Sequence, residues 1–195
     1  MRHGTGRRYC NMAQVITLRT PLTADICKSL HAGDRVLLTG IVYSARDTAH
    51  HRMLETILRG EPLPFSLPGE TIFYAGPTPA RPGMPTGAIG PTTSGRMDPF
   101  TPKLLEMGIK GMIGKGVRSL AVREAIAKYH SVYFGAVGGI AALLAQCVQD
   151  AVWVAYQDLG PEGIMRFQVL NFPLVVINDC HGGDLYREGR ERYRE

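Results

Sequence analysis

The sequence predicts an α/β fold in which helices cover a sheet. Strand-like apolar runs alternate with helical patterns through the second half of the 195-residue chain. The hydrophobic content of 45% is that of a globular core, and no internal repeat is present. We therefore expect residues 12–195 to form a single domain. Residues 1–11 are polar and basic, and we interpret them as a disordered tail or as the result of a start codon wrongly assigned upstream of Met12.

The first predicted strand and helix are followed by a long proline- and glycine-rich region. Residues 35–45, RVLLTGIVYSA, are rich in Val, Leu and Ile and end in small residues, which is typical of a buried strand. Residues 47–58 then show apolar side chains at a helical spacing. Segment 60–95 is dense in Pro and Gly, but the strand-like TIFYAG at 71–76 interrupts it. We interpret this segment as ordered loops and a strand.

The rest of the chain is predicted to alternate helices and strands. Helices are expected at about residues 99–107, 117–129 and 138–147. Strands are expected at residues 109–116, 131–137 and 152–157. Two last strands are expected within residues 165–179, on either side of a turn at Asn171–Pro173. Loops that follow strands are where α/β sheets usually carry their functional residues, so the strand ends are the places to search.

Cysteine spacing argues against a metal centre made by this chain alone. The four cysteines lie far apart and form no CxxC pair: Cys10, Cys27, Cys147 and Cys180. Structural zinc and iron–sulfur sites normally contain at least one closely spaced pair. We expect these residues to be reduced, structural thiols, with no metal-binding or cofactor-binding residue in this chain.

Charge and hydropathy exclude two further classes of partner. The formal net charge is +5, but the basic residues are dispersed, apart from Arg7–Arg8 and the stretch from Arg187 to Arg194, so we expect no nucleic-acid partner. The apolar run at 136–148 is too short for a membrane helix of about 20 residues. The basic N-terminus lacks the apolar segment of a signal peptide. We therefore predict a cytoplasmic protein without a membrane partner.

Three polar segments stand at the ends of predicted strands. They are SARDTAHHR at 44–52, GPTTSGRMD at 90–98 and GKG at 114–116. Arg46 and Arg96 each offer a planar fork that grips a carboxylate through two hydrogen bonds, and Lys115 adds a point charge. Two arginines suit a dicarboxylate.

Each residue of these segments also has a purely structural interpretation. The alternatives are a helix cap for Asp47, a surface ion pair for Arg46, structural roles for the histidines His50 and His51, turn-bracing hydroxyls for Thr92 and Thr93, and a solvent-exposed Lys115. Taken together, the three segments favour a site for an anion.

The order of the motifs resembles a known enzyme family. The motifs are ARDTAHHR, GPTTSGRMD, IGKG, VYFGAVGGIAALLA and DLGPEGI followed by FPLVVINDCHGGDLY. In this order they are similar to the β subunit of class I (iron–sulfur) fumarate hydratases and of L-tartrate dehydratases. The resemblance covers about residues 33–187.

The resemblance implies a fold, a partner and a reaction. The fold is a swivelling β/β/α domain, equivalent to the C-terminal half of single-chain relatives. The partner is an α subunit that holds a 4Fe–4S cluster on three cysteines and leaves one iron open to the substrate. The reaction is the reversible hydration of fumarate to malate. The absence of a cluster motif in this chain agrees with a cluster carried by the partner.

The resemblance also implies roles for four residues. Arg46, Thr92, Arg96 and Lys115 occupy the substrate positions of the β subunit, and Thr92 is the candidate for the proton-abstracting base. A threonine hydroxyl needs strong cationic neighbours to act as a base, and Arg96 and Lys115 supply them. Lys115, which the nearby arginines would help to deprotonate, remains a rival base.

The motif GPTTSGRMD is expected to form a rigid loop. Gly90 and Pro91 would fix its turn, while supporting residues brace it: Thr93, Ser94 and Asp98.

Three other functions remain open. L-Tartrate differs from malate only by an added hydroxyl group, so an L-tartrate dehydratase β subunit is the nearest alternative. A stand-alone module that binds a dicarboxylate without catalysis is the second. A purely structural scaffold subunit is the third, although it would give Arg46, Thr92 and Arg96 no reason to converge.

Overall fold

The computed structural model describes residues 15–137 and 139–194, so the predicted extension at residues 1–11 and Met12 lie outside the described residues. The mixed α/β class is confirmed. The described residues form a seven-stranded sheet. Its strands are β1 (Val15–Arg19), β2 (Arg35–Ser44), β3 (Thr71–Phe73), β4 (Gly111–Gly114), β5 (Val132–Gly135), β6 (Val148–Ala155) and β7 (Ile164–Asn178).

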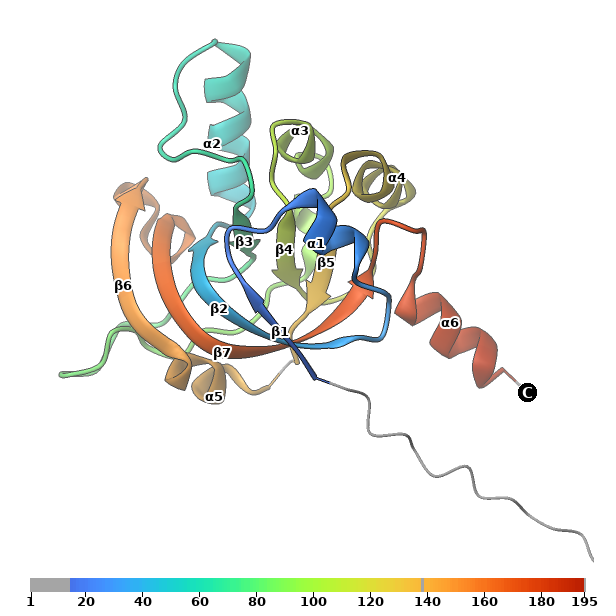
Figure 1. Cartoon of the computed structure of the whole chain (residues 1–195). Helices are drawn as coiled ribbons and strands as arrows, with labels where there is room; N and C mark the ends of the chain where they lie inside the picture. The colour runs from blue at the N-terminus through green and yellow to red at the C-terminus, as the bar shows by residue number, and fades with distance from the viewer. Residues whose placement is uncertain (1–14, 138, 195) are drawn as a thin grey trace, which may run out of the picture.

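Five of these strands close into a barrel. Strands β2, β3, β4 and β5 run parallel, and β7 pairs antiparallel with both β5 and β2, which completes the ring. Strand β1 extends the sheet beside the first half of β2, and β6 extends it beside the first half of β7 (Figure 1). The sequence predicted a sheet covered by helices but not its closure.

The prediction of two strands around a turn at Asn171–Pro173 is wrong. Residues Ile164–Asn178 form one continuous strand, because both halves of it pair antiparallel with β2 and the chain direction never reverses. The strand bends instead. Asn171 adopts a left-handed backbone with φ of 50°, opposite the register shift of β2 between Leu38 and Gly40. This bend lets one long strand reach both β2 and β5.

The helices contact both faces of the barrel wall. They are α1 (Ala24–Lys28), α2 (Asp47–Leu58), α3 (Thr101–Glu106), α4 (Leu120–Tyr129), α5 (Ala141–Gln146) and α6 (Leu185–Arg192), with short 3-10 turns η1 (Ser94–Met97) and η2 (Gln157–Glu162). Helices α2, α3, α4 and α6 pack against the outside of the barrel, whereas α1 and α5 contribute side chains to its inner cluster. Helix α2 has the predicted bounds. Helix α4 begins three residues later than predicted because Ser119 caps it, its hydroxyl accepting from the Val122 amide at 3.4 Å. Strand β1 and helices α1 and α6 were not predicted.

Two hydrophobic clusters occupy the two faces of the barrel wall. The inner cluster includes Phe134 of β5, Phe167 and Phe172 of β7, and Phe73 of β3. The outer cluster lies between the barrel and helices α2, α3 and α4, and Tyr74 and Tyr133 are fully buried within it. Because both faces of β3, β4 and β5 are buried, these strands hold the loops after them in fixed positions.

No helix in the part of the chain that the structure describes combines the length and the apolar character needed to cross a membrane. The assignment to the swivelling β/β/α fold stays a prediction.

Candidate functional site

The three polar segments meet at one edge of the sheet. Strands β2, β3 and β4 are parallel, so their carboxyl ends lie at the same edge. Arg46 follows β2 and is the N-cap residue of α2. Lys115 directly follows β4. Between them, Thr92 joins the end of β3, because its amide donates to the carbonyl oxygen of Tyr74 at 2.7 Å.

The motif GPTTSGRMD continues the sheet with its backbone. The Lys115 amide donates to the carbonyl oxygen of Thr92 at 3.3 Å, and the Ser94 amide donates to the carbonyl oxygen of Lys115 at 2.9 Å. Thr93 and Lys115 form a parallel bridge, and the chain then turns into η1, which carries Arg96. The motif is therefore an added strand segment followed by a 3-10 turn, which explains why it needs few apolar side chains.

Side chains below the motif brace it against β4 and β5. The Ser94 hydroxyl lies 2.9 Å from the Tyr133 hydroxyl, and the Tyr133 hydroxyl donates to the carbonyl oxygen of Gly116 at 2.9 Å. A side chain at Gly114 would collide with the Ser94 hydroxyl, so glycine is required for this close approach. The expected supporting role of Ser94 thus has a defined partner.

Each of the two arginines is held by a carboxylate. Arg46 Nη2 lies 3.1 Å from Glu162 Oε1, and Glu162 also accepts a hydrogen bond from Thr48. Arg96 Nη2 lies 2.6 Å from Asp47 Oδ2. Arg46 is 24% exposed and Arg96 is 45% exposed. Asp47 therefore binds Arg96 and makes no side-chain cap for its helix.

These ion pairs leave donors available for a ligand. A guanidinium group has five N–H donors, and only one nitrogen of each arginine contacts its acid. Arg46 Nε is buried and has no acceptor among the described residues. The carboxylates thus orient the two guanidinium groups, and the remaining N–H donors of each group can still bind an anion.

The structure brings all four predicted site residues to this edge. Arg46 and Thr92 are partly buried, whereas Arg96 and Lys115 are exposed. The edge is therefore accessible and contains three cationic groups. Asp47 and Glu162, which hold the arginines, were not predicted as their partners. Glu162 lies far along the chain in η2, so the sequence offered no spacing that pairs it with Arg46.

A buried ion pair below the edge was also missed. The Arg118 side chain is 0% exposed, its Nε donates to Asp98 Oδ1 at 2.7 Å, and it lies over the rings of Tyr74 and Tyr133. Burial opposes its charge, yet Tyr74, Asp98 and Tyr133 raise the pKa of Arg118. Asp98 Oδ2 also accepts from the Ser119 amide at 2.6 Å. The last residue of the motif is thus tied to the loop that follows Lys115.

His50 is a structural histidine that should make stability depend on pH. It is fully buried, and its Nδ1 donates to the carbonyl oxygen of Arg46 at 2.8 Å. Burial lowers the pKa of His50 from 6.5 to about 4. Between these values the unfolded chain binds a proton that the folded chain does not. Stability from His50 is therefore complete above pH 6.5 and is lost as the pH falls toward 4, by about 3 kcal/mol in total.

Urea unfolding at a series of pH values checks this prediction. His50→Gln should weaken the loss of stability below pH 6.5. His51→Gln is the matched control, because His51 is the next residue of the same helix and its side chain is 63% exposed. An unchanged pH dependence in His50→Gln would contradict the assignment.

Comparison with known proteins identifies the family of this chain. The family model described as Fumarase C-terminus matches residues 5–189. The chain is 41% identical to fumarate hydratase 1, mitochondrial, of Leishmania major over 79% of this chain and 28% of the relative. It thus spans about 28% of the length of this relative.

Two relatives match over most of both chains. A putative L(+)-tartrate dehydratase subunit beta of Methanocaldococcus jannaschii is 37% identical over 89% of this chain and 92% of the relative. The L(+)-tartrate dehydratase subunit beta of Escherichia coli K12 is 33% identical over 91% of this chain and 90% of the relative. With the family model covering nearly the whole sequence and these two relatives matching almost end to end, the chain belongs to the fumarase C-terminus family.

Proposed function

We propose that this chain is the β subunit of a heteromeric hydro-lyase that catalyses the reversible hydration of fumarate to malate. The observation that carries the proposal is the gathering of Arg46, Thr92, Arg96 and Lys115 at one accessible sheet edge. Two guanidinium groups there suit a substrate with two carboxylates. The match to 92% and 90% of two tartrate dehydratase β subunits supports a separate β chain that works with an α subunit.

The proposed reaction assigns each of these residues a role. In the direction from malate, a base removes a proton from the carbon beside one carboxylate, and hydroxide leaves the neighbouring carbon. Negative charge builds on that carboxylate in the transition state, where preorganised N–H donors of Arg46 and Arg96 would stabilise it. Thr92 is the proposed base, with Arg96 and Lys115 as cationic neighbours that favour its alkoxide. Lys115 is the rival base.

The 4Fe–4S cluster of the proposed enzyme is assigned to the α subunit. Among residues 15–137 and 139–194, no three His, Cys, Asp or Glu side chains are grouped to hold a metal ion. Burial raises the pKa of the Cys27 thiol to about 12, which opposes the thiolate form that iron ligation requires. The described residues therefore do not fit the cluster, and each role proposed for this chain belongs to its arginine, threonine and lysine side chains.

Activity assays of the assembled protein test the proposal. This chain and a candidate α subunit with three cluster-type cysteines would be produced together without oxygen and assayed with fumarate, malate and L-tartrate. The pair should hydrate fumarate, whereas this chain alone should be colourless and inactive. Activity on tartrate alone would favour the L-tartrate dehydratase alternative, which the matched β subunits support. An active, brown chain without a partner would contradict the division of roles.

Arg96→Lys is expected to lower turnover of the assembled enzyme about 10²–10³-fold, because lysine keeps the charge but loses the forked donors. Lysine can still pair with Asp47, so the fold should not change. Steady-state kinetics with malate measure the effect. Arg59→Lys is the matched control, since Arg59 also pairs with a single acid, the exposed Glu61, but lies at the far end of α2. Equal turnover in both variants would remove Arg96 from the site.

A further inference from the structure

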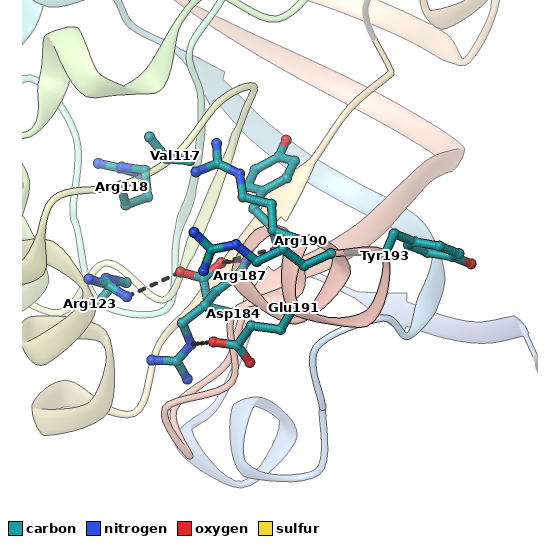
Figure 2. Close-up of a pocket in the computed structure, with 10 residues that line it drawn as sticks. Val117, Arg118, Arg123, Asp184, Arg187, Arg190, Glu191 and Tyr193 are labelled. Carbon is teal, nitrogen blue, oxygen red and sulfur yellow. Dashed lines mark hydrogen bonds and ion pairs between the residues drawn. The ribbon is translucent and has the colours of Figure 1, made fainter.

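A groove rich in arginine lies between helix α6 and the loop after β4. Its volume is about 780 Å³, and its lining includes Val117, Arg118, Arg123, Arg190, Tyr193 and Arg194. Figure 2 shows Arg118 and Arg123 on one side of the groove and the side chains of α6 on the other. None of the roles proposed above uses α6.

Ion pairs within the groove account for only some of its positive charge. Arg123 lies 3.2 Å from Asp184 and Arg187 lies 4.0 Å from Glu191, as the dashed lines in Figure 2 mark. Arg118 is already paired with Asp98 below the surface. Arg190 and Arg194 are exposed and form no ion pair with any residue that the structure describes. The groove therefore carries uncompensated positive charge.

Exposed apolar side chains accompany these arginines. Val117 is 55% exposed, and Leu120, three residues further along, is 62% exposed. Tyr193 on the opposite side is 82% exposed. Tyrosine and arginine are among the residues enriched at the energetic centres of protein–protein interfaces. A small-molecule site would instead enclose most of its ligand, which this open groove does not.

The groove adjoins the candidate substrate edge. Val117 follows Lys115 by two residues, so one wall of the groove starts where the edge bearing Arg46, Thr92, Arg96 and Lys115 ends. A protein that completes the substrate site from outside could therefore contact the groove as well.

Charge disfavours two occupants that belong to this chain. Residues 1–11 contain Arg2, Arg7 and Arg8 and no acidic residue, so the arginines of the groove would repel them. A second copy of the chain would add its own net charge of +5. Opposite charge across an interface favours association, which leaves an acidic segment of another protein as the fitting occupant.

We propose that this groove docks an acidic segment of the partner α subunit, through Arg190 and Arg194, with Val117 and Tyr193 as apolar contacts. The inference rests on the proposed function, because the α subunit is the partner that the proposed function assigns to this chain. The groove would be a second surface that contacts the α subunit, beside the substrate edge. This surface contributes to assembly without contacting the substrate.

Binding of the α subunit to this chain tests the proposal. The double variant Arg190→Glu/Arg194→Glu should raise the Kd for the α subunit by at least about tenfold at low ionic strength, because it places like charges together. The difference should shrink as salt is added. The control Arg19→Glu/Arg81→Glu changes the net charge equally on exposed residues outside the groove and should bind like the unchanged chain. The neutral variant Arg190→Gln/Arg194→Gln should show a smaller loss.

The outcomes separate this inference from the proposed function. If the α subunit binds the unchanged chain and the glutamate variant equally, the docking surface is wrong and the proposed function stands. If the α subunit does not bind the unchanged chain at all, both are wrong. Two further measurements look for another occupant: self-association of the chain alone, and its binding to random-sequence duplex DNA. If the unchanged chain shows either of these and only the glutamate variant loses it, the inference is overturned. Circular dichroism and thermal unfolding check that each variant remains folded.

Discussion

Replacing Thr92 with alanine is expected to lower the kcat of the assembled α–β enzyme about 10²–10⁴-fold, the usual contribution of a positioned general base. The substitution removes the hydroxyl group and leaves the backbone bonds to Tyr74 and Lys115 in place, so the sheet edge should keep its shape. The measurement is kcat and KM with malate on the enzyme with its cluster intact. The fall in kcat should be at least as large as any weakening of substrate binding.

Two neighbouring substitutions make this result decisive. Thr93→Ala is the matched control, because Thr93 is the adjacent threonine of the same segment and is exposed; it should act mainly through stability. Lys115→Ala tests the rival base and also keeps its backbone bonds to Thr92 and Ser94. If Thr92→Ala kept near-normal turnover while Lys115→Ala abolished it, Lys115 would be the base.

Asp98→Ala is expected to destabilise the folded chain by about 3–5 kcal/mol, because it leaves a buried guanidinium without its counter-charge. Arg118 is 0% exposed and Asp98 is 12% exposed, so water cannot replace the lost carboxylate. The Ser119 amide loses its acceptor as well. Urea unfolding of the isolated chain measures the change. Because Asp98 closes the motif that carries Thr92 and Arg96, turnover of the assembled enzyme should also fall.

An exposed ion pair supplies the control for Asp98→Ala. Arg52 binds Asp158 through two hydrogen bonds of 2.8 Å, but Asp158 is 63% exposed, so Asp158→Ala should shift the unfolding midpoint far less. The double variant Asp98→Ala/Arg118→Met should recover part of the lost stability, since it removes the unpaired charge. Equal effects of Asp98→Ala and Asp158→Ala would show that burial of the pair is unimportant.

Much of the candidate site could be predicted because it depends on local features of the chain. Arg46 and Lys115 follow apolar segments that are recognisable as strands, and parallel strands place their following residues at one edge. The composition of GPTTSGRMD indicated a polar loop, and its resemblance to a family supplied the prediction of which side chains face a substrate. Strand β1 and helix α1 were not predicted; the five residues of α1 make little more than one helical turn, which is too short to show a helical periodicity.

Local sequence patterns were enough to predict the alternation of strands and helices, the family, and the residues that stand at the strand ends. Which groups meet depends on the tertiary structure. The closure of the barrel depends on β2 pairing with both β3 and β7, and on a bend at Asn171 that resembled a turn. The ion pairs of Arg46 with Glu162, Arg96 with Asp47 and Arg118 with Asp98 join segments that are distant along the chain. Such partners are selected by burial and by the geometry of the folded chain, and short-range periodicity contains no information about them.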